Sequence, residues 1–190
     1  MELDEIDRRL ISLLREDGRL SYTRLGELLG YTLMGAKRRV RKLIDGGVLK
    51  VTALESVEAL RFRGALIMLE VADQRSLEDL LRRFRDCPRI IYLFTLMAGY
   101  NLAALMVAED EETLESEAWE RCSIRSQPGI RRSEFYPIGE VYFSPYLPIR
   151  FELWSMNRER APCGVDCGVC ERYRDGRCRG CPSTRLYRFD

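Results

Sequence analysis

The cysteines near the C-terminal end are the residues whose type and spacing most directly predict chemistry. Five of the seven cysteines follow the pattern C-x3-C-x2-C-x7-C-x2-C, at Cys163, Cys167, Cys170, Cys178 and Cys181. A C-x2-C pair can offer two sulfurs to one ion across a tight turn. Disulfides are the alternative, but a reducing cytosol disfavours them. The spacing therefore predicts a metal site built from thiolates.

Two metal centres are compatible with these ligands, because both can be held by sulfur alone and the chain contains no histidine. Four of the cysteines can bind Zn2+ tetrahedrally, although the gap between the pairs is shorter than the ~15–20 residues of common zinc ribbons. Four can equally bind a [4Fe–4S] cluster. The segments CGVDC and CRGCP resemble small cysteine-rich modules of unassigned function that are taken to bind zinc. In either case one of the five cysteines is surplus.

A second candidate site is a basic helix near the N-terminal end. Residues 32–43 contain five basic side chains and no acidic one. On a helical wheel one side carries Leu33, Ala36, Val40 and Leu43, and the other carries Met34, Lys37, Arg38 and Arg41. Basic side chains near DNA neutralise phosphate and release counterions. The pattern therefore predicts a helix that binds DNA.

Two kinds of DNA contact are expected from this region. Lys37 and Arg38, one turn into the helix, can reach base edges, whereas Arg41 and Lys42 are better placed for phosphates. Met34 is expected either to touch a thymine methyl group or to pack. Hydroxyls at the start of the preceding helix can bind phosphate together with backbone N–H groups. The candidate DNA-binding residues are Ser21, Thr23, Thr32, Met34, Lys37, Arg38, Arg41 and Lys42.

Three short helices must position this basic face. Apolar residues at positions 3, 6, 10, 13 and 14 have helical spacing, with Asp4 as a cap and Gly18 as a left-handed closing residue. A second helix is expected from the cap Ser21 to Gly30, and a third from Thr32 to position 46. Two short helices joined by a glycine-containing turn, the second one basic, indicate a helix-turn-helix.

The following residues predict a sheet domain. After a wing-like strand at 48–54, strands are expected at 65–71, 90–97, 102–107 and 130–137, and helices at 76–85 and 110–122. The order β-α-β-β-α-β is typical of a ferredoxin-like sandwich. Its helices cover one face of the sheet. The other face is apolar enough to pair with a second subunit.

The chain is therefore expected to belong to the α+β class. We predict a winged helix-turn-helix domain at 1–50, a wing and hinge at 51–63, a ferredoxin-like ligand-binding and dimerisation domain at 64–149, and a separate cysteine-rich metal-binding module at 150–190. The apolar run at 90–107 is broken at 99–101, short of the ~20 residues of a membrane span. The acidic N-terminus lacks the features of a signal peptide. A cytoplasmic protein without a membrane partner is expected.

The stretches LDEIDRRL, EDGRLSY, RRVRKL and GGVLK closely resemble the start of the leucine-responsive/AsnC (Lrp/AsnC) transcription regulators, and the similarity continues to about residue 140. The resemblance implies binding to double-stranded DNA, a homodimer or larger homo-oligomer, and a small-molecule effector in the ferredoxin-like domain. Gly99 matches a glycine in the family's effector-binding turn, but Tyr100 and Asn101 follow it and the family's acidic residue is absent. These three residues are candidate effector contacts, with an ordinary β-turn as the alternative.

Three hypotheses about function follow. The first is a dimeric, sequence-specific transcription regulator, not an enzyme, that responds to a small-molecule effector or to metal or redox state through its cysteines. The second is an enzyme similar to the siroheme decarboxylases, which resemble the same family but use histidine around the tetrapyrrole, whereas this chain has none. The third is an architectural protein that binds DNA with little sequence preference.

Overall fold

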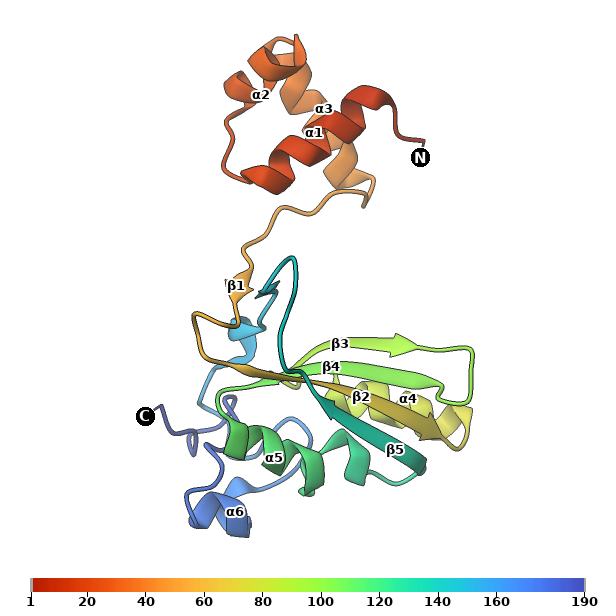
Figure 1. The fold of residues 1–190 in the computed structure, drawn as a ribbon, viewed down its shortest axis with the longest axis vertical. Coiled ribbons are helices and arrows are strands. Elements are labelled where there is room, and N and C mark those ends of the chain that lie inside the picture. Colours follow the sequence, from red (N-terminus) through yellow and green to blue (C-terminus); the bar gives the residue numbers. More distant parts are fainter. Residues whose placement is uncertain (1, 190) are drawn as a thin grey trace. The chain divides into compact units, whose positions relative to one another are not determined.

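The computed structural model describes residues 2–189, which fold into two compact units. The first unit extends to Ala53, and the second begins at Leu54. Figure 1 shows that the first unit is made of helices and that the second contains a sheet with helices packed on it. No helix within the described range is long and apolar enough to cross a membrane.

Three helices form the first unit: α1 (Glu5–Glu16), α2 (Tyr22–Leu29) and α3 (Leu33–Asp45). Each begins after the capping residue that the sequence predicts. The side chains of Asp4, Ser21 and Thr32 accept hydrogen bonds from the backbone N–H three residues later, at 2.7, 3.2 and 3.1 Å. The helices enclose a core of Leu10, Leu25, Leu29, Ala36, Val40 and Leu43. The predicted helix-turn-helix is confirmed.

Three details predicted for this unit are wrong. The extended residue Asp17 ends α1, and Gly18 is not left-handed. Leu33 is 45% exposed, because it occupies the first position of α3, ahead of the residues that pack in the core. The wing strand expected at 48–54 is absent from the described chain. A strand needs a partner for its backbone groups, and the described part of this unit contains only helices.

The second unit contains a four-stranded antiparallel sheet in the order β3-β4-β2-β5, with α4 and α5 on one face (Figure 1). In chain order its elements are β2 (Arg63–Val71), α4 (Gln74–Phe84), β3 (Ile90–Thr95), β4 (Leu102–Ala108), α5 (Glu111–Trp119) and β5 (Ile130–Pro137). Alternate residues of β2, among them Ile67 and Leu69, are fully buried with Leu80 and Phe84 of α4. This order of elements matches the predicted ferredoxin-like sandwich.

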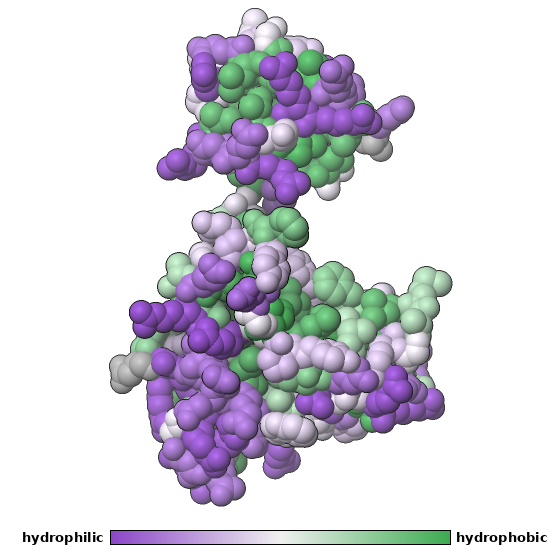
Figure 2. Space-filling model, in the orientation of Figure 1, coloured by the Kyte–Doolittle hydropathy of each residue, from purple (hydrophilic) through white to green (hydrophobic). Residues whose placement is uncertain are grey.

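The other face of the sheet is partly open. The strand register places Tyr92, Leu105, Leu66 and Tyr136 in one row across the four strands. In the next row Phe94 lies beside Tyr92 with the two rings tilted, their centroids 5.6 Å apart, and both rings are exposed. Figure 2 shows apolar surface over the strands and mainly polar surface around α6 (Glu171–Arg174). The opposite end of the open face is covered by the chain itself, through Val57 and Ile149.

Two short strands and the C-terminal segment complete the second unit. β1 (Glu55–Ser56) pairs with β6 (Tyr146–Leu147). Beyond β6 the described residues contain α6, the 3-10 turns η2 (Phe151–Leu153) and η3 (Cys167–Val169), and one isolated bridge between Arg158 and Thr184.

The expectation that residues 150–190 form a separate module is corrected by the structure. Ala161 and Cys163 lie in the same buried core as β2 and α4, and the segment clusters with the sheet in one compact unit. A segment of about 40 residues buries too little apolar surface for a stable core of its own. It therefore shares the core of the sheet domain.

Candidate functional site

The exposed side of α3 gathers the basic residues predicted to bind DNA. Four of them have no acidic partner within the described chain: Lys37, Arg38, Arg41 and Lys42. Lys37, Arg38 and Arg41 line a shallow groove together with Thr32 and Met34. Met34 is 66% exposed, so its side chain does not serve the core. This face offers cations and one apolar group to a partner outside the unit.

The fifth basic residue of α3 has a different role. Arg39 pairs with the carboxylates of Asp4 and Asp7, with N–O distances of 2.8 and 2.7 Å, and its guanidinium lies 5.1 Å from the ring centre of Tyr31. The hydrogen bond from Arg39 holds the pKa of Asp4 below its ordinary value, and the same contacts raise the pKa of Arg39. Because Asp7 is fully buried, this ion pair fastens α3 to α1.

The connection between α2 and α3 depends on close backbone packing. A Cβ atom at Gly26 would lie 2.6 Å from the Tyr31 carbonyl oxygen, and Gly30 ends α2 in the left-handed conformation, with φ of 73°. At the start of α2 the Ser21 hydroxyl accepts a backbone hydrogen bond, which leaves its proton available to donate to another group. Ser21 and Thr23 are exposed there, as a phosphate contact requires.

In the turn predicted to bind an effector, at 99–101, the Asn101 side chain supports the backbone of β2. The Asn101 side chain accepts a hydrogen bond from Val71 N–H at 2.8 Å and donates one to the Val71 carbonyl at 2.9 Å. It thus replaces a strand neighbour at the irregular end of β2. Tyr100 lies under the guanidinium of Arg132, 4.3 Å from its ring centre, and Gly99 has open space around it. The effector role of these residues stays a prediction.

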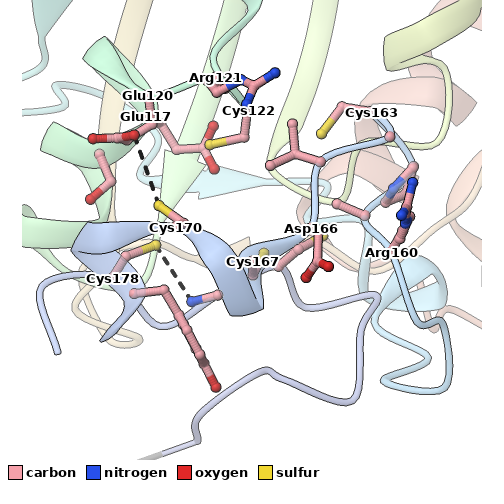
Figure 3. Close-up of a pocket in the computed structure, with 18 of the residues that line it drawn as sticks. Glu117, Glu120, Arg121, Cys122, Arg160, Cys163, Asp166, Cys167, Cys170 and Cys178 are labelled. Carbon is pink, nitrogen blue, oxygen red and sulfur yellow. Dashed lines mark hydrogen bonds between the residues drawn. The ribbon is translucent and has the colours of Figure 1, made fainter. Parts of the chain in front are cut away.

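All seven cysteines of the chain line one pocket of about 810 Å3 in the second unit. The pocket lies between the C-terminal segment and the region of α5 and of the loop before β3. Figure 3 shows Cys163, Cys167, Cys170 and Cys178 around it, with Cys122 and two glutamates opposite. Each cysteine is a free thiol. The structure therefore brings together the five cysteines that the sequence pattern predicts, and adds Cys87 and Cys122.

The five clustered thiols have unequal surroundings. Burial raises the pKa of Cys167 and Cys181 to about 11, and it also raises that of Cys163 and Cys178. Backbone N–H groups act in the opposite direction at these sulfurs: Val165 on Cys163, Cys181 on Cys167, Gly180 on Cys178, and Ser183 on Cys181. The Gly180 N–H lies 3.4 Å from its sulfur. The Cys170 thiol instead donates to the Glu120 carboxylate, at 3.8 Å (Figure 3).

A buried arginine connects this pocket with the sheet. Arg89, just before β3, is 3% exposed and pairs with Glu109 and Glu117, at 2.9 and 2.8 Å. The same guanidinium donates to the carbonyl of Gly180, within the second C-x2-C turn, at 2.6 Å. Burial alone would lower the pKa of Arg89, but the two carboxylates outweigh it and raise the pKa well above the ordinary value. Arg89 is therefore charged, and it joins this turn to two buried carboxylates.

The donor set of the pocket suits a thiophilic metal, since it is rich in sulfur and lacks histidine. Within the described residues, however, no three cysteine or carboxylate side chains already form a group close enough to bind an ion. A metal would therefore have to draw the sulfurs together. Such coupling between metal binding and local folding is common in small sulfur-ligated segments.

The sequence patterns do not predict the roles of two residues at these sites. Arg39 looks like part of the basic face until Asp7, one turn into α1, is seen to be its partner. The acidic pair Asp4 and Asp7 is the only signal that points to it. Arg89 lies between α4 and β3 in the sequence, and its partners are 20, 28 and 91 residues away. Nothing local indicates its role.

Comparison with known proteins places these features in context. The AsnC-type helix-turn-helix domain matches residues 3–44. An uncharacterized HTH-type transcriptional regulator of Pyrococcus horikoshii is 30% identical over 149 residues, covering 73% of this chain and 89% of that protein.

Solved structures agree on the fold. The structure of E. coli AsnC has a TM-score of 0.66 at 14% identity, covering 76% of this chain and 97% of that one. A transcriptional regulator of Neisseria meningitidis, solved as a complex with L-Met, has a TM-score of 0.68 at 20% identity, covering 78% and 96%.

Proposed function

Since the chain belongs to the AsnC/Lrp family of HTH-type transcriptional regulators, we propose that it binds a specific DNA sequence through α3. The relatives that it matches are regulators and not enzymes, and the chain is likewise a DNA-binding regulator and not an enzyme. In this proposal α3 lies in the major groove, and the start of α2 contacts the phosphate backbone.

The observation that carries the proposal is that the basic residues of α3 differ in whether they have an acidic partner. Arg39 is used within the unit, whereas the four other cations face outward without an acidic partner in the described chain. Lys37 and Arg38 contact base edges, and Arg41 and Lys42 contact phosphates. The exposed Met34 contacts a thymine methyl group. The hydroxyls of Ser21, Thr23 and Thr32 donate to phosphate oxygens.

A homodimer is the expected DNA-binding form, with larger oligomers built from it. The open sheet face supports this, because Tyr92 and Phe94 are apolar and exposed beside a row that ends in Tyr136. A two-fold axis through paired sheets would give two reading helices and hence a palindromic operator with half-sites about 10 base pairs apart.

The signal enters through the second unit. Of the two candidate inputs, metal or redox state at the thiol pocket has the stronger support, because the second C-x2-C turn is hydrogen-bonded to Arg89 beside the sheet. A small-molecule effector at the turn of Gly99, Tyr100 and Asn101 is the second candidate, and L-Met is the ligand of the Neisseria regulator. Since the Asn101 amide is already bonded to the backbone, we favour the thiol pocket.

Fluorescence anisotropy tests the proposal on a duplex selected by the wild-type chain from random DNA. Arg38→Ala is expected to weaken binding to the selected duplex by about 1–3 kcal/mol and to relax its specificity. Arg41→Ala is expected to weaken binding to all sequences alike and to lower the salt slope by about 1. Arg82→Ala, which removes the same charge from an exposed site on α4, is the control.

Three outcomes are distinguishable. Loss of affinity in the α3 variants but not in the control supports the proposal. Equal effects in all three variants would contradict it. Equal affinity of the wild type for selected and random DNA would favour an architectural protein instead.

A further inference from the structure

We infer that Cys167 and Cys170 form a reversible redox site, at which a peroxide converts the two thiols to a disulfide. The inference rests on the proposed redox input through the thiol pocket and deepens it, because it names the two sulfurs and the class of oxidant. The chemistry lies within the second unit and can be measured without DNA. Disulfides in a reducing compartment are usually transient bonds of this redox-sensing kind.

The backbone between the two cysteines places their side chains within reach of each other. The 3-10 turn η3 begins at Cys167, and the Cys170 N–H closes it by donating to the Cys167 carbonyl oxygen at 3.0 Å. In a 3-10 turn, side chains three residues apart lie on the same side, and the rise of about 2.0 Å per residue separates their Cα atoms by about 6 Å. Disulfides usually join Cα atoms about 4.4–6.8 Å apart. The turn therefore allows the bond without a large movement of the backbone.

Burial determines which of the two sulfurs an oxidant meets first. Cys167 is buried, and burial raises the pKa of its thiol to about 11, which makes it a poor target for free peroxide. Cys170 is only partly buried and lines the pocket. The other partly buried cysteines, Cys87, Cys122 and Cys181, pack against the core of the sheet, whereas Cys170 lies outside that core. Cys170 is thus the first sulfur to be oxidised.

The first oxidation step uses the contact between Cys170 and Glu120. The Cys170 thiol donates to the Glu120 carboxylate at 3.8 Å (Figure 3), so Glu120 can take the proton as the sulfur attacks one oxygen of the peroxide. The O–O bond breaks, and the sulfur becomes a sulfenic acid. The hydroxide that leaves receives the proton from Glu120 and becomes water.

The second step forms the disulfide. The oxidised Cys170 sulfur turns about its Cα–Cβ bond toward Cys167, and the Cys167 sulfur displaces the hydroxyl group, which leaves as water with the Cys167 proton. The turn holds the two sulfurs as neighbours, which offsets the low reactivity of the buried thiol. In total the two thiols lose two electrons, and one hydrogen peroxide is reduced to two molecules of water.

The second C-x2-C pair, Cys178 and Cys181, has different surroundings. Cys178 is buried, and its sulfur accepts a hydrogen bond from the Gly180 N–H at 3.4 Å. The Gly180 carbonyl is held by the buried Arg89 at 2.6 Å. Within the described chain, no backbone hydrogen bond closes a turn between Cys181 and Cys178. This pair is therefore expected to stay reduced and serves as an internal comparison.

Thiol mapping of the full chain tests the inference. The chain is reduced, stripped of metal with a chelator, and then exposed to hydrogen peroxide. The number of free thiols is expected to fall from seven by two, and the peptide that contains Cys167 and Cys170 should lose both thiol hydrogens in mass spectrometry. Dithiothreitol should restore all the thiols. No loss of thiols, or a disulfide between Cys178 and Cys181 instead, would overturn the inference.

Variants of the two cysteines separate their roles. In Cys167→Ser the sulfenic acid at Cys170 has no partner and should accumulate, which dimedone labelling detects. Cys170→Ser should lose no thiols at the same peroxide concentration. The matched control Cys122→Ser removes another thiol of the pocket and should form the disulfide as the wild type does. Wild-type loss of thiols in Cys170→Ser would contradict the inference, and because no DNA is present, this result is separate from a failure of DNA binding.

Discussion

The helices of the first unit begin at contacts between neighbours in the sequence, whereas the cysteine-rich segment is held by contacts that reach across the second unit. Asp4, Ser21 and Thr32 cap their helices over three residues. By contrast, the Arg83 side chain donates to the carbonyl of Cys163, 80 residues later, and that of Arg89 to Gly180, 91 residues later.

The same difference decides what arginine does in each region. On α3 the outward cations have no acidic partner among the described residues, so they remain available to phosphate. In the cysteine-rich segment Arg172 pairs with Glu115 at 2.6 Å and Arg179 with Asp110 at 2.5 Å, which fastens the segment to α5. A basic composition therefore indicates a nucleic-acid surface only where the charges are unpaired.

The largest expected effect comes from removing the link between the thiol pocket and the sheet. Arg89→Met would leave the buried Glu109 and Glu117 without a cation, which typically costs about 3–5 kcal/mol. Urea unfolding followed by tryptophan fluorescence measures this directly, since both tryptophans, Trp119 and Trp154, lie in the second unit. Arg82→Ala, an exposed pair on α4, should stay within about 0.5 kcal/mol of the wild type. A similar small value for Arg89→Met would show that the link is dispensable.

In the first unit the largest effect is expected at the tight helix connection. Gly26→Ala places a methyl group 2.6 Å from the Tyr31 carbonyl oxygen, where backbone must move, and should cost about 1–3 kcal/mol. Gly35→Ala is the control, because the nearest atom there is a movable Tyr31 side-chain carbon at 3.2 Å. Thermal unfolding by circular dichroism should separate the two variants, and equal midpoints would refute the packing argument.

The Arg39 ion pair should make the first unit sensitive to acid. Arg39→Ala strands the buried Asp7 and should cost about 1–3 kcal/mol at neutral pH. Arg39 lowers the pKa of Asp4 in the folded state, so the part of the stability that comes from the Arg39–Asp4 pair is present above the unfolded pKa and is lost as the pH falls through the folded pKa. The gap in stability between wild type and variant should therefore narrow on acidification below pH ~4. A gap that is constant with pH would exclude the proposed linkage.

The smallest effect distinguishes a structural turn from an effector site. Asn101→Ala removes two hydrogen bonds to Val71 and should destabilise the second unit by about 1–2 kcal/mol. Gly99→Ala should be neutral, since open space surrounds that position and its φ is ordinary. Unfolding followed by tryptophan fluorescence compares the two variants. An unchanged stability of Asn101→Ala would show that the two hydrogen bonds are dispensable and would favour an effector role for this residue.

The sequence predicts the elements whose causes are local. Caps at Asp4, Ser21 and Thr32, the left-handed Gly30 and the strand and helix order of the sheet domain all follow from spacing over a few residues. The convergence of the five clustered cysteines on one pocket also follows from their spacing.

The remainder depends on partners that are distant in the sequence. The strand expected at 48–54 has β-forming residues but no strand beside it in the described first unit. The boundary expected at 150 follows a change of composition, whereas Ala161 and Cys163 are buried against the sheet core. Similarly, only the fold shows that the Cys170 thiol faces the Glu120 carboxylate and that the Gly180 N–H faces the Cys178 sulfur.

Control of the DNA-reading helix by the thiol pocket is tested most directly by one comparison of affinities. The selected duplex is titrated with metal-loaded chain and with chain stripped of metal, at the same salt concentration. The proposal predicts that the two dissociation constants differ at least ~5-fold, the lower end of usual allosteric coupling. The difference should vanish in a variant in which Cys178 and Cys181 are both replaced by serine. Equal affinities of the loaded and stripped wild type would contradict regulation through the pocket.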